Sequence, residues 1–334
     1  MITSITRLVL HVMSKISFNM EDPVIRIKII GVGCSGIRAL NMMAENAIPH
    51  VEFIAADTGI SNLNKSKTTN RIQIVNEMVT GLRSTSNSDI GKQPTKETIK
   101  EIKTKLFRAN VLLLIAGMDE GTANSTVSII AKTAKEMGIL TIAIIIEPFE
   151  LEDEYKREIT KKRIIILENK VDSLFVIPRT KILDSKPSLG LEDEYWRFQD
   201  QLFQATTTIL DIFTKDGVVG LGFNDLKNLM KDKGIALLGI GVGENNKEVL
   251  EATFKALNIS LIPDISLKNS EDVLIHITAG YEFTVQDSKQ IIALFIKKIG
   301  DETFILVGIV IDDKFDSKVR IAIIATGFNS NVKS

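Results

Sequence analysis

The chain has 334 residues, of which 44% are hydrophobic and 25% are charged, and its formal net charge is -1. This length suits two domains or one large one, and the balanced charge excludes a dedicated nucleic-acid binder. The single cysteine, Cys34, excludes a disulfide framework, and three widely separated histidines give no Cys/His metal cluster. The longest apolar runs have the length of strands, so we expect no direct membrane insertion by a spanning helix.

Residues 1–23 differ in composition from the rest. They carry Arg7, His11 and Lys15, and no acid precedes Glu21. Such a pattern is found in organelle targeting segments and in amphipathic segments that lie on membranes. It is equally compatible with a plain N-terminal extension, which we favour.

From residue 24 the chain alternates between strand-like and helix-like segments. Apolar, β-branched runs occur at 24–30, 51–56, 111–115, 139–146 and 173–177, and the stretches between several of them have helical periodicity. This alternation predicts a parallel sheet with helices on both faces, which is a doubly wound α/β domain over residues 24–190.

The pattern changes after residue 190. Residues 192–214 contain no Pro or Gly and repeat apolar side chains at helical spacing, which predicts one long central helix within 191–215. A second, mixed α/β domain is then expected over residues 216–328, followed by a short tail, 329–334. Its predicted strands are 235–242, 272–278, 304–311 and 318–326, and its predicted helices are 247–257 and 285–299. Because the last two strands are close in sequence, we expect them to form a hairpin.

A glycine-rich loop, Gly31-Val32-Gly33-Cys34-Ser35-Gly36, follows the first predicted strand and opens the first predicted helix. The G-x-G-x-x-G spacing allows a tight turn, and backbone N–H groups at a helix start favour a phosphate. The alternative is a turn whose glycines only permit close packing. A dinucleotide enzyme would place an acid about 20 residues further on, and Asp57 lies near that position. No proton-transfer partner for such chemistry is identifiable, and the Walker A motif is absent.

Segments spread from residue 25 to residue 328 resemble the FtsZ branch of the FtsZ/tubulin superfamily, the GTP-dependent filament proteins of bacterial division. The resemblance rests on the order and spacing of many short pieces, among them Ile27–Gly33, Val51–Ala55, Ala116–Met118, Pro148–Phe149, Val171–Leu174, Phe223–Asp225, Leu238–Gly241, Ile277–Gly280 and Ala325–Phe328. It implies a tubulin/FtsZ-like fold, bound GTP with Mg²⁺ as a candidate cation, and head-to-tail filaments. It also implies that hydrolysis is completed in trans, by a loop of the neighbouring subunit.

The resemblance also implies which residues contact the nucleotide. Asp200 matches the acid on the central helix that recognises guanine. The alternative is that Asp200 is only a polar residue on a helix. Glu152 matches a ribose contact, with Lys156 near a family arginine, and Arg38 is either a phosphate contact or a solvated residue. The full nucleotide-binding set is Gly31, Gly33, Cys34, Ser35, Gly36, Arg38, Asp57, Thr58, Gly121, Thr122, Ala123, Asn124, Glu152, Lys156 and Asp200.

Two loops depart from the family pattern. The signature phosphate loop, G-G-G-T-G-T-G in the family, begins here with Asp119 and Glu120, which either repel phosphate or lie in solvent. The catalytic loop, N-x-D-F-A-D in the family, has Gly220 and Gly222 in place of its amide and its first acid. Only Asp225 remains as a candidate catalytic residue, and its alternative role is to cap a helix over 226–231.

Two hypotheses follow from these matches and departures. In the first, the chain is an FtsZ-like GTPase of the cytoplasmic division site that polymerises and hydrolyses GTP weakly. In the second, it is a nonhydrolysing FtsZ paralog that regulates or co-assembles with another FtsZ and with division proteins. An NAD enzyme is a distant third. The chain stops six residues after Phe328, so we expect no C-terminal peptide for membrane-tethering partners.

Overall fold

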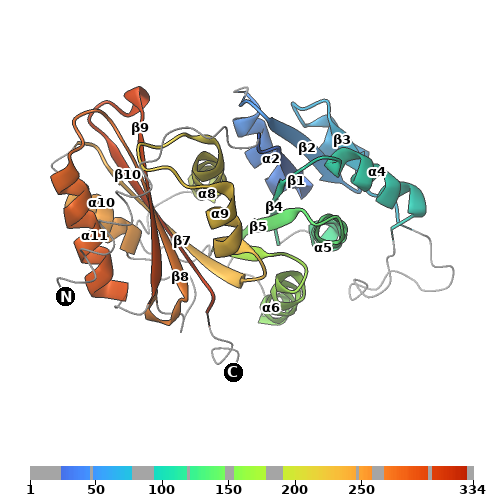
Figure 1. Cartoon of the computed structure of the whole chain (residues 1–334). Coiled ribbons are helices and arrows are strands. Elements are labelled where there is room, and N and C mark those ends of the chain that lie inside the picture. Colours follow the sequence, from blue (N-terminus) through green and yellow to red (C-terminus); the bar gives the residue numbers. More distant parts are fainter. Residues whose placement is uncertain are drawn as a thin grey trace. The chain divides into compact units, whose positions relative to one another are not determined.

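A computed structural model describes residues 24–45, 48–76, 94–118, 121–146, 154–177, 191–245, 248–257, 267–299 and 303–328 (Figure 1). By their internal contacts, the described residues form two compact units. One unit comprises Val24–Thr207, and the other begins at Thr208, so the division falls within one long helix. No described helix is both long and apolar enough to cross a lipid bilayer.

The unit Val24–Thr207 is built on a parallel sheet, as the alternating sequence pattern predicted. Its strands lie in the order β3-β2-β1-β4-β5-β6. Strand β3, which is only three residues long, was not predicted from the sequence. The bounds are β1 Ile27–Val32, β2 Val51–Asp57, β3 Arg71–Gln73, β4 Val111–Gly117, β5 Leu140–Ile146 and β6 Ser173–Ile177.

Helices cover both faces of this sheet, which confirms the doubly wound prediction. On one face, α2 packs against β1, β2 and β4. On the other, α4, α5 and α6 bury a core that includes Ile102, Val127 and Leu167 against Ile30 and Leu114 (Figure 1). The helices are α2 Gly33–Met43, α3 Ile60–Asn64, α4 Lys96–Leu106, α5 Gly121–Glu136 and α6 Glu154–Glu168.

The predicted long helix is present as α8, Leu191–Thr214. The unit that begins at Thr208 contains its last turns and a four-stranded arrangement in the order β7-β10-β8-β9. Helices α10 and α11 bury apolar side chains against this sheet. The bounds are α9 Phe223–Met230, β7 Gly234–Gly243, α10 Val249–Leu257, β8 Asp272–Ala279, α11 Val285–Ile299, β9 Phe304–Ile311 and β10 Val319–Thr326.

The predicted hairpin of the last two strands is wrong. Strand β9 pairs in parallel with β8, whereas β10 lies between β7 and β8 and is antiparallel to both. The connection crosses the end of β8, because the Asp312 N–H donates to the Ala279 carbonyl and the Gly280 N–H donates to Lys318. A Cβ on Gly280 would lie 1.4 Å from the Asp316 carbonyl oxygen, so the connection packs directly on this glycine. The mixed character of the domain is confirmed.

Candidate functional site

Strand order alone marks one place on the sheet as a binding site. From β1 the chain passes to β2 on one side and later to β4 on the other. In doubly wound sheets, ligands bind outside the carboxyl ends of the strands at such a switch point. Helix α2 starts at Gly33, immediately after β1, and α5 starts at Gly121, after β4. Two helix N-termini therefore follow neighbouring strands at the same edge.

The three loop glycines each have a backbone reason to be glycine. Gly33 has a φ of 71°, in the left-handed region that side chains rarely adopt. A Cβ on Gly36 would lie 2.2 Å from the Ile115 carbonyl oxygen, and one on Gly31 would lie 2.4 Å from the Gly36 oxygen. Close packing of α2 against β1 and β4 thus needs Gly31 and Gly36 even without a ligand. The packing alternative raised by the sequence is therefore part of the explanation.

The start of α2 has the properties of an anion site. Its N-cap residue, Val32, provides no side-chain hydrogen bond, and its first turn contains no acid. Ser35 is buried, whereas Cys34 and Arg38 are half-buried and each has further interactions within the protein. Unpaired N–H groups at a helix start carry a partial positive charge and bind phosphate groups. The residues of the predicted first phosphate loop thus lie together at the end of β1 and the start of α2.

Asp57 and Thr58 lie at the end of β2, next to β1. The Asp57 carboxylate is buried, and each of its oxygens accepts one local hydrogen bond. Its Oδ1 accepts a hydrogen bond from the Gly59 N–H at 2.7 Å, and its Oδ2 accepts one from Asn62 Nδ2 at 3.0 Å. The aspartate thus shapes the turn that starts α3, while the Thr58 carbonyl accepts a weak bond from Gln73 at 3.5 Å. The local structural role of Asp57 was not predicted from the sequence.

Several predicted contacts are described only in part. Gly121, Thr122, Ala123 and Asn124 form the first turn of α5, and Lys156 belongs to α6, but their side chains lie outside the described part. Asp119, Glu120 and Glu152 lie outside the described residues altogether. Asp200 is exposed on α8, where it accepts a hydrogen bond from Gln204 at 2.8 Å. The exposed carboxylate retains lone pairs for a ligand.

Asp225 belongs to the unit that begins at Thr208. Helix α9 begins at Phe223 with Gly222 as its N-cap, so Asp225 is in the first helical turn and does not cap the helix. The predicted helix start was three residues too late, and the capping alternative for Asp225 is wrong. Its carboxylate lies close to the start of the helix: a Cβ on Gly222 would be 3.4 Å from Asp225 Oδ2. Among the described residues no group of acids, cysteines and histidines suits a metal ion.

The loop between α8 and α9 is fixed to the sheet behind it. Val219 exchanges two backbone hydrogen bonds with Ile309 of β9, at 3.2 and 3.1 Å. Leu221 packs over Gly308, where a Cβ would approach the leucine to 2.7 Å and His276 to 3.1 Å. The loop that carries Gly220 and Gly222 therefore has a defined path, in spite of its three glycines.

A group of charged side chains, of which Asp211 is buried, holds the end of α8 to the same sheet. Arg320 of β10 donates to Asp211 of α8, and Lys215 lies 3.3 Å from Asp211 and 2.7 Å from Asp312. The hydrogen bond from Lys215 lowers the pKa of Asp312. Burial, aided by the charge of Arg320, lowers the pKa of His276 to about 4. This group was not predicted from the sequence, where its signal is the single charged residue of β10, Arg320.

Comparison with known proteins agrees with the geometry. Residues 26–186 match the family model "Tubulin/FtsZ family, GTPase domain", and residues 234–329 match "FtsZ family, C-terminal domain". The chain is 31% identical to Cell division protein FtsZ 1 of Thermococcus kodakarensis, over 93% of this chain and 83% of that protein. It is 30% identical to the mitochondrial division protein fszA of Dictyostelium discoideum, over 92% of this chain and 59% of that protein.

A solved structure shows the same fold. It is described as an empty FtsZ dimer of M. jannaschii and superposes with a TM-score of 0.81 at 24% identity, covering 97% of this chain and 92% of the other. The identity of the Thermococcus relative over most of both chains, the two family models and the shared fold lead to one conclusion. This chain belongs to the FtsZ family of the tubulin/FtsZ GTPases.

Proposed function

We propose that this chain binds GTP beyond the carboxyl ends of β1 and β4 and assembles head to tail into filaments that act in cell division. One observation carries the proposal: α2 and α5 begin at the same edge of the sheet, after neighbouring strands, and the start of α2 has neither a capping side chain nor an acid in its first turn. Two helix N-termini suit the negative charge of a nucleotide's phosphates.

The choice of guanine rests on Asp200. A carboxylate accepts hydrogen bonds from the N1–H and exocyclic amine of guanine, whereas adenine offers no such pair of donors. Asp200 is exposed and has one hydrogen-bond partner in Gln204. Glu152 and Lys156 are the proposed contacts to the ribose side. Mg²⁺, as a hard cation, would be held mainly by phosphate oxygens and water, with carboxylates in supporting roles.

Hydrolysis in this proposal is slow and is completed in trans. Gly220 and Gly222 lack the side chains that would orient and polarise the attacking water, and Asp225 remains in the first turn of α9. Loss of one positioned group of this kind costs about 100-fold in rate. The fixed path of the loop, through Val219 and Ile309, suits a segment that must enter a neighbouring subunit's pocket in one geometry.

The alternative is a nonhydrolysing paralog that regulates or co-assembles with another FtsZ. Asp119 and Glu120 favour it. A carboxylate about 5 Å from a phosphate charge costs roughly 3 kcal/mol at an effective dielectric near 20, which is about two decades of affinity. Under either proposal the chain works with itself, another FtsZ or division proteins at the cytoplasmic division site. A targeting role for residues 1–20 would change the compartment and not the chemistry.

The deciding experiment follows binding, turnover and assembly in the same samples. The full chain is titrated with fluorescent GTP and ATP, and phosphate release and light scattering are recorded with and without Mg²⁺. We expect GTP to bind in preference to ATP, assembly to need GTP, and phosphate release to be slow. Absence of GTP binding at millimolar concentration would leave only the paralog. Tight GTP binding and assembly without phosphate release would contradict the proposed GTPase activity and support the proposed filament.

Completion in trans has its own test. Asp225→Ala keeps the proposed pocket and loses the loop carboxylate, whereas Asp200→Ala keeps the loop and weakens the pocket. We expect each variant alone to be nearly inactive and an equal mixture to recover about a quarter of the wild-type rate, because that fraction of random interfaces joins an intact pocket to an intact loop. A mixture no faster than the mean of its parts would contradict hydrolysis in trans.

A further inference from the structure

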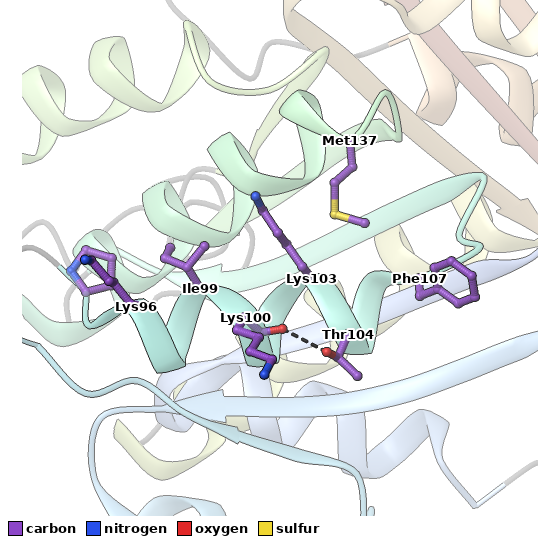
Figure 2. A pocket seen from close by; sticks show the side chains of 8 residues that line it. Lys96, Ile99, Lys100, Lys103, Thr104, Phe107 and Met137 are labelled. Atoms are coloured by element: carbon purple, nitrogen blue, oxygen red, sulfur yellow. Dashed lines mark hydrogen bonds between the residues drawn. The ribbon is translucent and has the colours of Figure 1, made fainter.

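A lysine-lined groove runs along α4, on the unit Val24–Thr207. It has a volume of about 720 Å³ and lies between the outer face of α4 and Met137, directly after α5. Figure 2 shows Lys103 extending from α4 toward α5, and Met137 beyond the end of α5. The lining residues are Pro94, Lys96, Ile99, Lys100, Lys103, Thr104, Phe107 and Met137.

The groove has an apolar floor and a positively charged rim. Ile99 and Met137 are half-buried and pack against the core, which fixes the floor. Phe107 is 64% exposed at one end of the groove, and the Arg108 guanidinium lies 5.4 Å from the centre of its ring. The three lysines are exposed, and none of the ion pairs among the described residues involves them. Their charges are therefore open to a ligand.

The helix separates its charges by face. At 3.6 residues per turn, Lys96, Lys100 and Lys103 fall within about 60° of arc, whereas Glu97 and Glu101 lie roughly a third of a turn away. Thr98, Ile102 and Leu106 occupy the third face and are buried in the core. The groove side of α4 thus carries three positive charges and no negative one, in a chain whose net charge is close to zero.

A membrane is a poor fit to this surface. Helices that bind a bilayer surface insert a continuous apolar face between flanking lysines. Here the apolar face of α4 is buried within the protein, and the remaining apolar groups of the groove are half-buried at its floor, with Phe107 alone exposed. A concave floor between two helices instead suits the ridge of a third helix.

We propose that this groove binds an acidic amphipathic helix of a partner protein. The partner places one or two apolar side chains on Ile99, Met137 and Phe107, and its carboxylates at i, i+4 and i+7 face the lysines, which repeat at the same spacing. From Lys96 to Phe107 the groove face spans about 16 Å at 1.5 Å per residue, so about three turns of partner helix cover it. Charge complementarity, concavity and an exposed aromatic anchor all favour this one kind of occupant.

The probe is a synthetic helical peptide of about 16 residues, with Glu on one face and Leu and one Trp on the other. A peptide of the same pattern with Lys in place of Glu is the charge control. Vesicles of phosphatidylcholine and phosphatidylserine in equal parts represent the membrane. Binding to the full chain is measured by fluorescence anisotropy at low and high salt. The methyl signals of the nine methionines report where the peptide binds.

Two groove variants test the two halves of the site. Lys100→Glu with Lys103→Glu reverses the rim, and Phe107→Ser removes the anchor. The matched control, Lys289→Glu with Lys297→Glu, makes the same change in net charge on α11, where both lysines are exposed. All of these side chains are at the surface, so circular dichroism and thermal melting should match those of the wild type.

We expect the acidic peptide to bind in the micromolar range, more weakly at high salt, and to shift the Met137 methyl signal. Both groove variants should weaken it by about tenfold or more and the α11 control by less than twofold. Four results would overturn the inference. The first two are the absence of saturable peptide binding, and binding to the groove variants that is as strong as to the wild type. The third is binding of vesicles through the same lysines without peptide binding, and the fourth is a loss of self-association in the groove variants that added peptide does not reproduce in the wild type.

Discussion

The loop before α9 offers a gain-of-function test of the proposed slow GTP hydrolysis. Gly222 has a φ of -69° and a ψ of 149°, which any residue adopts, and within the described residues a Cβ there meets only Asp225 Oδ2, at 3.4 Å. Gly222→Asp therefore adds a carboxylate to the loop without backbone strain. The new group would stand beside Asp225 in the first turn of α9.

The expected size of the effect follows from two opposing terms. A positioned group that polarises the attacking water is worth about 100-fold in rate. Two like charges about 5 Å apart in a water-like dielectric repel by about 1 kcal/mol, which offsets about fivefold of that gain. We expect Gly222→Asp to raise the kcat for GTP by about 20-fold, with little change in GTP affinity, as measured by phosphate release at saturating GTP.

Gly222→Asn is the matched control, because asparagine caps a helix start as well as aspartate and adds no charge. Relative to Gly222, both variants should stabilise α9 by a few tenths of a kcal/mol, and only the aspartate should raise the rate. An unchanged rate in Gly222→Asp would refute the idea that the missing acid limits turnover. Equal rate increases in both variants would assign the effect to helix capping.

Three further predictions concern stability and pH. Gly36→Ala should lower the melting temperature even without nucleotide, because its Cβ would lie 2.2 Å from the Ile115 carbonyl oxygen and overpacking costs about 1–3 kcal/mol. An unchanged melting temperature of the nucleotide-free protein would mean that the glycine serves only ligand binding. The folded-state pKa of His276 is lowered to about 4, so the unfolded state binds the extra proton and stability should fall by up to about 3 kcal/mol as the pH drops from 6.5 to 4. Urea unfolding across this range should show a shallower fall for His276→Gln, and equal slopes would contradict the assignment. Arg320→Met leaves the Asp211 carboxylate with only a lysine partner and should cost about 2–3 kcal/mol in urea unfolding, whereas wild-type stability would show that the pair contributes nothing.

Backbone-level features were predictable from the sequence, and side-chain roles were not. The five longer strands of the parallel sheet and the helix α8 follow from local periodicity, which neighbouring residues carry by themselves; β3, three residues long, is too short to show it. Strand pairing depends on the whole topology, so closeness in sequence wrongly paired β9 with β10. The helix start at Phe223 was misjudged because Gly222 gives no capping side chain to signal it.

In the candidate site too, local patterns were predictable from the sequence and side-chain contacts were not. The loop glycines were found from their spacing, because G-x-G-x-x-G is a local pattern. The double hydrogen bond of Asp57 to Gly59 and Asn62 depends on the rotamer of one side chain, and spacing does not reveal it. The ion pair between Arg320 and Asp211 joins residues that are 109 positions apart in the sequence, so only the folded chain brings them together.

The position of β10 has a consequence for the order in which the chain folds. All strands of the unit Val24–Thr207 have been synthesised by Ile177, so this unit has its complete sheet early. In the other unit the last strand is an inner one, and β7 and β8 have no shared neighbour until Val319–Thr326 has left the ribosome. Domains of nascent chains fold as units, the N-terminal one first. The unit Val24–Thr207 should therefore fold while the other unit is still an incomplete sheet with exposed strand edges. Aggregation through these edges should remain possible until the last strand, β10, has paired.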